Sequence, residues 1–81
     1  MNKLYELSND EKIELIRQNK YLDIFVKDTN WIIRKEVARH GYGLNILIND
    51  SNWAIVNSAI LYCKKHKDKE ECQKILQLYN L

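Results

Sequence analysis

The chain of 81 residues has the length of one small domain, and it contains two glycines and no proline. Because proline is excluded from helix interiors and glycine weakens them, this composition favours helices and argues against collagen-like, disordered and turn-rich all-β chains. Thirteen basic and eleven acidic residues leave a formal net charge of +2, which is too balanced to indicate a nucleic-acid-binding protein by composition alone.

Residues 9–19 form the first predicted helix. Ser8 and Glu11 have the spacing of a capping box, in which each side chain accepts a hydrogen bond from the backbone N–H of the other residue. Apolar residues follow on the same segment at Ile13 and Ile16. Because no short helix precedes this long one, residues 1–21 are predicted to be the N-terminal half of a two-helix unit.

The middle of the chain repeats itself at a fixed offset of 22 residues, which is the separation between Leu22 and Leu44. We call this offset the repeat period. Similarity at a fixed offset is typical of helical repeat proteins, whose units stack on one another. The identical pairs are Leu22 and Leu44, Ile24 and Ile46, Asp28 and Asp50, Asn30 and Asn52, Trp31 and Trp53, and Ile33 and Ile55.

Each repeat is predicted to contain a short helix, an acidic turn and a long helix. Asp28 and Asp50 are placed to cap the long helices, and Gly41 ends the first of them. Repeat 1 covers residues 22–43 with helices at 22–27 and 29–40, and repeat 2 covers residues 44–65 with helices at 44–49 and 51–65.

Residues 66–81 are predicted to be a C-terminal capping helix, with helical residues at 69–79. Asp68 and Glu71 have the spacing of a second capping box. The helix would close the apolar core with a stripe spaced i, i+3, i+4 and i+7, made of Cys72, Ile75, Leu76 and Tyr79.

The segment DTNWIIRKEVA at residues 28–38, followed by Gly41, Leu44, Leu47 and Asp50, resembles the variant leucine-rich repeat and the related HEAT-like α-helical repeats. The resemblance covers residues 22 to about 60. It implies an all-α fold, a short right-handed α-solenoid of about two 22-residue helical repeats with N- and C-terminal capping helices. Such solenoids usually bind a protein and sometimes a nucleic acid.

The resemblance also implies roles for individual residues. Arg34 matches a position that often pairs with an acidic neighbour. Repeat 2 departs from the pattern, because Val56 stands where an arginine is expected and Ile60 replaces the small alanine. We therefore expect no ladder of Asp and Arg pairs between the units. The residues that the resemblance places in the core are Trp31, Ile33, Val37 and Ala38.

Charged residues are scarce in repeat 2. Between Gly41 and Cys63, Asp50 is the one charged side chain. A helix that is apolar on all sides is normally buried on all sides. Two arrangements fit this pattern: the long helix at 51–65 is either a central helix covered by its neighbours, or it is covered in part by another subunit or partner.

No catalytic site is predicted. His40 and His66 have neither an acidic partner at a suggestive spacing nor a serine or cysteine nucleophile in a known motif. Cys63, His66 and Cys72 could supply three zinc ligands, and the two cysteines could form a disulfide, but both cysteines also fit apolar helix positions. We therefore expect a non-enzymatic protein with no metal and no cofactor.

The cytoplasm is the expected compartment. Two cysteines are too few for a disulfide scaffold, and the amino terminus lacks the long apolar stretch of a secretory signal. The longest run without a charged residue is 51–63, which is well short of the roughly 20 residues that a membrane-spanning helix needs. No membrane segment is therefore expected.

The repeat and the apolar second unit favour a protein-binding module. A bias toward asparagine, isoleucine and lysine points to an A+T-rich genome, so we expect a small bacterial or phage regulator or inhibitor that occupies a partner protein's surface. A homodimer could use the same face. Successive long helices of a solenoid line one surface, and arginine and tyrosine are common interface anchors. The expected contact residues are Arg34, Lys35, Arg39, Tyr42, Asn57 and Leu61.

A nucleic-acid-binding helical repeat is the alternative function. The cluster Lys64, Lys65, Lys67 and Lys69 could contact phosphates. The same lysines lie near the predicted end of a helix, where cations complement the exposed carbonyl groups. Salt separates the two functions, because phosphate binding fades steeply with ionic strength and an apolar interface does not.

Overall fold

The computed structural model describes residues 4–80, and these residues form helices joined by short turns. No strand occurs among them, so the predicted all-α class is confirmed. A short 3-10 helix at the start, η1, was not expected from the sequence. The elements are η1 (Leu4–Glu6), α1 (Asn9–Arg17), α2 (Leu22–Phe25), α3 (Trp31–Arg39), α4 (Leu44–Leu47), α5 (Trp53–Lys65) and α6 (Glu70–Leu78).

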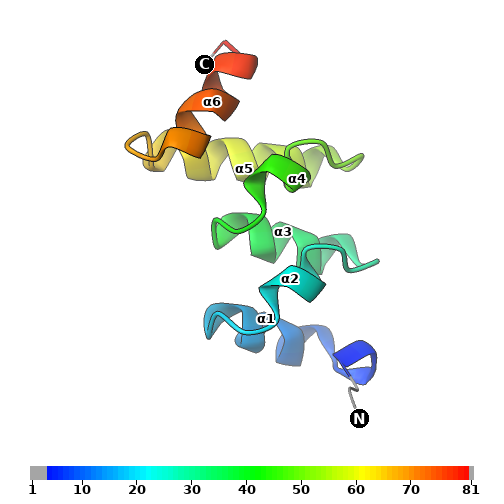
Figure 1. The fold of residues 1–81 in the computed structure, drawn as a ribbon. Helices are drawn as coiled ribbons and strands as arrows, with labels where there is room; N and C mark the ends of the chain where they lie inside the picture. Colours follow the sequence, from blue (N-terminus) through cyan, green and yellow to red (C-terminus); the bar gives the residue numbers. More distant parts are fainter. Residues whose placement is uncertain (1–3, 81) are drawn as a thin grey trace.

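The three long helices α1, α3 and α5 lie side by side and run in the same direction (Figure 1). The short helices α2 and α4 connect them, and α6 packs on α5 and α4 at the end of the stack. The molecule is therefore elongated, with extents of 43 × 23 × 18 Å. No helix in the described part of the chain is long and apolar enough to cross a bilayer.

Each long helix begins after a polar N-cap, and successive caps are one repeat period apart in the chain. Ser8 caps α1 and forms the predicted capping box with Glu11. Asn30 caps α3 and Asn52 caps α5, and each side chain accepts a hydrogen bond from the backbone N–H two residues later at 2.9 Å. These contacts satisfy backbone donors that a helix start otherwise leaves unpaired.

Asp28 and Asp50 are not the caps, which corrects the prediction. Each lies two residues before its asparagine and accepts a hydrogen bond from that asparagine's backbone N–H, at 2.8 Å for Asp28 and 2.9 Å for Asp50. An N-cap must directly precede the first helical residue, and that position belongs to Asn30 and Asn52. The aspartates therefore shape the turn that holds each cap.

The second predicted capping box, Asp68 with Glu71, is wrong. Helix α6 begins at Glu70, so Lys69 occupies the N-cap position, and it makes no side-chain capping bond. Asp68 stands one residue too early to act as the cap. The apolar stripe of α6 is nevertheless used: Cys72, Ile75 and Leu76 are buried, whereas Tyr79 stays partly exposed and donates a hydrogen bond to the Ile48 carbonyl oxygen.

The turns after α1 and α3 share left-handed backbone conformations. Asn19 and Gly41 have φ values of 64° and 86°, and Tyr21 and Gly43 have values of 59° and 63°. The members of each pair are again one repeat period apart. At Gly41 the conformation and the packing both demand glycine, because an added Cβ would lie 2.2 Å from Cζ of Tyr62.

The buried core runs through the whole stack between the long and the short helices. Ile33, Val37 and Ala38 are buried as predicted. Trp31 is not a core residue, which corrects the other part of that prediction: its exposed fraction is 42%, and that of the equivalent Trp53 is 65%. Each is the first residue of its long helix, about 200° around the axis from the isoleucine two residues later, so it faces away when the isoleucine faces inward.

Helix α5 is central in the stack and yet partly exposed. It contacts α3, α4 and α6, and residues along its inner side such as Ile55 and Ala59 are buried completely. A strip on its outer side remains open, formed by Trp53, Asn57 and Leu61. The neighbouring helices therefore explain most of the apolar character of α5 but leave this strip uncovered.

Candidate functional site

The exposed side of α3 and α5 forms the candidate site. On each helix three residues follow at i, i+4 and i+8, a spacing that places them on one stripe. Helices α3 and α5 pack side by side (Figure 1), and Arg39 and Leu61 line one groove between them, so the two stripes adjoin there. We name this surface the long-helix face, and it consists of Trp31, Lys35 and Arg39 on α3 and of Trp53, Asn57 and Leu61 on α5.

Four of the six contact residues predicted from the sequence lie on the long-helix face, namely Lys35, Arg39, Asn57 and Leu61. Tyr42 lies beyond the end of α3, in the turn that leads to α4, and is 39% exposed. Arg34 is the clear departure, because its side chain is largely buried and pairs with Asp50.

The Arg34 side chain forms hydrogen bonds with the turns that follow α2 and α4 and does not face solvent. Its Nε donates to Oδ2 of Asp50 at 2.8 Å, and its Nη2 donates to Oδ1 of the same carboxylate at 3.3 Å. Its Nη1 also donates to the carbonyl oxygens of Asp28 and Thr29. With an exposed side-chain fraction of 18%, Arg34 has little surface left for a partner.

A second pair repeats this contact one unit earlier. Lys12 Nζ donates to Oδ2 of Asp28 at 2.8 Å, and Lys12 and Asp28 precede Arg34 and Asp50 by one repeat period. The expectation of no Asp and Arg pairs is therefore wrong for Arg34 with Asp50, and a lysine takes the place of the arginine in the earlier pair. The third step would need an arginine at Val56 and is absent, so the ladder ends at α5.

The ladder also neutralises the carboxylates near the helix starts. Partial burial raises the pKa of Asp50. Hydrogen bonds from Arg34 and from the Asn52 backbone lower it, as does the positive charge of Arg34. The lowering is larger, so the pKa of Asp50 lies below its ordinary value. Asp50 thus remains ionised and engaged. It offers no free negative charge at the edge of the long-helix face.

The tryptophans are the exposed residues of the candidate site that sequence reasoning missed. Their exposure could have been read from the helical period, because Ile33 and Val37 define the buried side of α3 and Trp31 falls opposite to it. Lys35 extends over the Trp31 ring, with Nζ 5.4 Å from the ring centroid, which is a cation–π contact. Trp53 is left more open, with 65% of its surface exposed.

The face differs between its two ends. Trp31 and Trp53 lie at the amino-terminal ends of their helices, whereas Arg39, Lys64 and Lys65 lie at the carboxyl-terminal ends. From Trp53 to Lys65 the helix rises about 18 Å at 1.5 Å per residue. One end of the face is therefore aromatic and the other is basic.

A groove between α3 and α5 opens at the basic end. It has a volume of about 460 Å³. A smaller groove of about 210 Å³ lies at the corresponding place between α1 and α3. Arg39 contributes to both. The larger groove is lined by Arg39, Ser58, Leu61, Tyr62, Lys65 and His66.

Acidic side chains are nearly absent from the two helices of the site. Helix α5 carries none, and α3 carries Glu36 alone. The Glu36 side chain is 16% exposed and pairs with Arg39 Nη1 at 3.2 Å. The long-helix face therefore presents apolar and cationic groups without a free carboxylate from α3 or α5.

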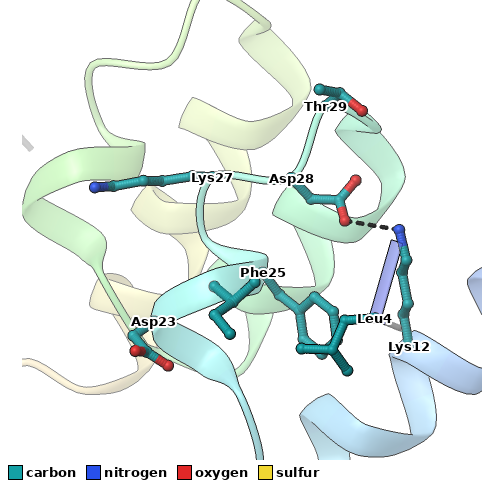
Figure 2. Close-up of a pocket in the computed structure, with 8 residues that line it drawn as sticks. Leu4, Lys12, Asp23, Phe25, Lys27, Asp28 and Thr29 are labelled. Atoms are coloured by element: carbon teal, nitrogen blue, oxygen red, sulfur yellow. Dashed lines mark hydrogen bonds and ion pairs between the residues drawn. The ribbon is translucent and has the colours of Figure 1, made fainter. Parts of the chain in front are cut away.

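Another cavity is lined by residues of η1, α1, α2 and the turn after α2, and is shown in Figure 2. It has a volume of about 430 Å³ and lies next to the pair of Lys12 with Asp28. Figure 2 shows the Lys12 amino group pointing to the Asp28 carboxylate, whereas the Asp23 and Lys27 side chains point away from it. Because the two buried charges neutralise each other, we assign them to the fold.

The two histidines weighed for catalysis have structural contacts. The His40 imidazole hydrogen-bonds the Asn19 side chain in the turn after α1. His66 stacks on Tyr62, with ring centroids 4.1 Å apart. Both rings therefore contribute to the packing of the turns at the ends of long helices.

The two cysteines, Cys63 and Cys72, are buried free thiols. Burial and a hydrogen bond with Cys72 raise the pKa of Cys63 to about 12, so it is not a reactive thiolate at neutral pH. No group of three potential metal ligands occurs within residues 4–80.

The basic cluster of the alternative function follows the end of α5. Lys64 and Lys65 are exposed in its last turn, and Lys67 is exposed in the next connection. Lys69 donates to the Tyr62 hydroxyl at 2.6 Å, a bond that raises the pKa of Lys69. Asp68, Glu70 and Glu71 are interspersed, so residues 64–71 carry four lysines and three carboxylates.

Comparison of this chain with known protein families, curated proteins and solved structures found no match. The resemblance to helical repeats therefore rests on the residues and the geometry of this chain.

Proposed function

We propose that this protein is a short right-handed α-solenoid, similar to variant leucine-rich and HEAT-like repeats, that binds another protein through its long-helix face. The units would be a half unit at 1–21, repeats at 22–43 and 44–65, and a cap at 66–81. The recurrence of the caps, the left-handed turns and the charged pairs at the repeat period supports this organisation.

The exposed tryptophans carry the functional part of the proposal. Two large aromatic side chains, Trp31 and Trp53, stand on adjacent helices with Leu61 further along the same face. Their apolar surface would be stabilised by burial, at roughly 25 cal/mol per Å² removed from water. Tryptophan and arginine are the residue types most enriched among interface hot spots, which suits Arg39 as well.

The mode of action follows from the same surface. Without a catalytic constellation in the described residues, a face of this kind acts by occupying part of another protein. A small bacterial or phage regulator or inhibitor would act in this way. A homodimer through the same face is the second candidate for the protein-binding function.

The test is capture of a partner from the source organism's lysate by the immobilised full chain. We compare the wild type with Trp31→Ala/Trp53→Ala and with a matched control, Ile46→Ala/Leu78→Ala, which removes exposed apolar groups outside the long-helix face. The expected result is a protein retained by wild type and control, resistant to nuclease and to 0.5 M salt (roughly a 4 Å Debye length), and lost by the tryptophan variant.

Retention that is unaffected by the tryptophan substitutions would overturn the choice of face. Retention of nucleic acid that disappears at high salt and on replacing Lys64 and Lys65 would instead support the alternative function. Self-association of the pure wild type, abolished by Trp53→Ala and measured by analytical ultracentrifugation, would identify a second copy as the partner. Circular dichroism and melting temperature confirm that each variant is folded.

A further inference from the structure

We infer that the partner segment of the long-helix face is an acidic amphipathic peptide, with apolar anchors at one end and carboxylates at the other. This inference rests on the proposed function. It is carried by the distribution of charge on the face, where aromatic groups and cations are separated along the helix axes.

The basic end calls for a partner with negative charge. Arg39 and Lys65 are exposed at the groove between α3 and α5, and Lys64 is exposed beside Lys65 in the last turn of α5. The neighbouring Glu36 pairs with Arg39. Carboxylates of a partner would form charge-assisted hydrogen bonds with these groups as they leave water.

A second copy of this chain meets that requirement poorly. Its own long-helix face has the same excess of cations and no free carboxylate on α3 or α5. A twofold contact between two such faces would bury Lys35, Arg39 and Lys65 of both copies without a free carboxylate from α3 or α5 to pair with them. Burying unpaired charges is unfavourable, so the observations favour a different, acidic partner.

A nucleic acid also fits less well than an acidic peptide. A nucleic acid carries phosphates along its whole strand and would need cations along the whole face. At the tryptophan end the face offers Lys35 as its cation, and the Lys35 amine already lies over the Trp31 ring. The exposed Leu61, at 49%, lies between the two ends and offers apolar area. A peptide can place its apolar and acidic side chains to match this order, whereas a uniform phosphate backbone cannot.

The length of the face sets the size of the peptide. A distance of about 18 Å corresponds to about twelve residues of helix, or about five to six residues of extended chain. The apolar anchors would contact Trp31 and Trp53. The carboxylates would meet Arg39 and Lys65 at the mouth of the groove.

The test is a selection of random 16-residue peptides displayed on phage against the immobilised full chain. The selected peptides are then synthesised and their dissociation constants are measured by fluorescence anisotropy. We expect aromatic or leucine anchors in one half and at least three Asp or Glu residues in the other. Both Trp53→Ala and Lys64→Glu/Lys65→Glu should weaken binding at least tenfold.

A matched charge control is provided by Lys27→Glu/Lys74→Glu, which makes the same change of charge at exposed lysines outside the face. This variant should bind the selected peptides within about twofold of the wild type, as expected for screened charges at a distance. Peptides whose carboxylates are replaced by lysine should bind the Lys64→Glu/Lys65→Glu variant better than the wild type.

The outcomes separate the inference from the proposed function. Peptides that need Trp53 but carry no excess of carboxylates overturn the acidic partner and leave the protein-binding function in place. Failure to select any peptide that depends on the tryptophans overturns both. A random single-stranded DNA or RNA pool is tested in parallel, and retention that depends on Lys64 and Lys65 overturns both in favour of a nucleic acid.

Discussion

Arg34 holds the centre of the molecule together through contacts that join three segments of the chain. Its guanidinium binds the Asp50 carboxylate and two backbone carbonyl oxygens in the turn before α3. Such planar, multiple donation is specific to arginine. Arg39, further along α3, makes a more exposed contact with Glu36, although both arginines have the same charge.

We predict that Arg34→Met lowers the free energy of unfolding by about 2 to 3 kcal/mol, because Asp50 and two carbonyl oxygens lose their donors in a largely buried place. Arg39→Ala is the control, with an expected loss below about 1 kcal/mol, since its side chain is 65% exposed. Urea denaturation monitored by circular dichroism measures both. Equal losses in the two variants would contradict the structural role of Arg34.

The pH dependence of stability tests the same contact between Arg34 and Asp50. Because the pKa of Asp50 is lowered in the folded protein, its contribution to stability is present above its unfolded pKa of about 4 and is lost as pH falls through the folded pKa. The stability difference between wild type and Arg34→Met should therefore shrink below about pH 4. A difference that stayed constant down to pH 2 would be inconsistent with an ion pair.

At the scale of the elements, polar caps start the three long helices, and residues with left-handed backbone follow the ends of α1 and α3. The repeat period sets the positions of the N-caps at Ser8, Asn30 and Asn52. After α3, Gly41 turns the chain toward α4 while the Tyr62 ring covers it. The turn is thus fixed both by its own backbone and by a side chain from α5.

We predict that Gly41→Ala lowers the free energy of unfolding by about 2 kcal/mol. About 1 kcal/mol comes from the positive φ, and the rest comes from displacing Tyr62 from His66 and Lys69. In a Tyr62→Ala background the same substitution should cost about 1 kcal/mol only. A double-mutant cycle measures the difference, and an identical cost in both backgrounds would show that the ring does not restrict the turn.

At the scale of the whole molecule, stability depends on the closing of an open-ended stack. Each long helix contacts mainly its neighbours, and α6 covers the side of α5 that faces away from α3. Cys72, Ile75 and Leu76 of α6 are buried there. Val56 and Cys72 stand where another charged pair would continue the ladder, and both are buried apolar residues suited to an end.

Deleting residues 68–81 should therefore expose Val56, Ile60 and Cys63, with aggregation or loss of cooperative thermal unfolding and increased binding of a hydrophobic dye. A milder variant, Ile75→Ala, should remain folded and lose about 2 to 4 kcal/mol of stability. Calorimetry and dye fluorescence measure these effects. A truncated chain that melts like the intact one would refute the capping role of α6.

The sequence alone determined the local elements of this protein. Helix class, the approximate helix boundaries, the Ser8 capping box and the repeat period could all be predicted, because caps, breakers and periodicity act within a few residues of one another. Four of the six expected contact residues also lie on the exposed face, since helical spacing separates the inner from the outer side.

Tertiary structure decided how these elements use their side chains. The pairing of Arg34 with Asp50 depends on how closely the turn after α4 approaches α3, and no local rule fixes that approach. The resemblance to helical repeats placed Trp31 in the core, but α3 turns Ile33 and Val37 inward and leaves the tryptophan exposed. Which exposed residues adjoin depends on how the helices pack against one another, so only the tertiary structure could bring Trp31 of α3 and Trp53 of α5 onto one face.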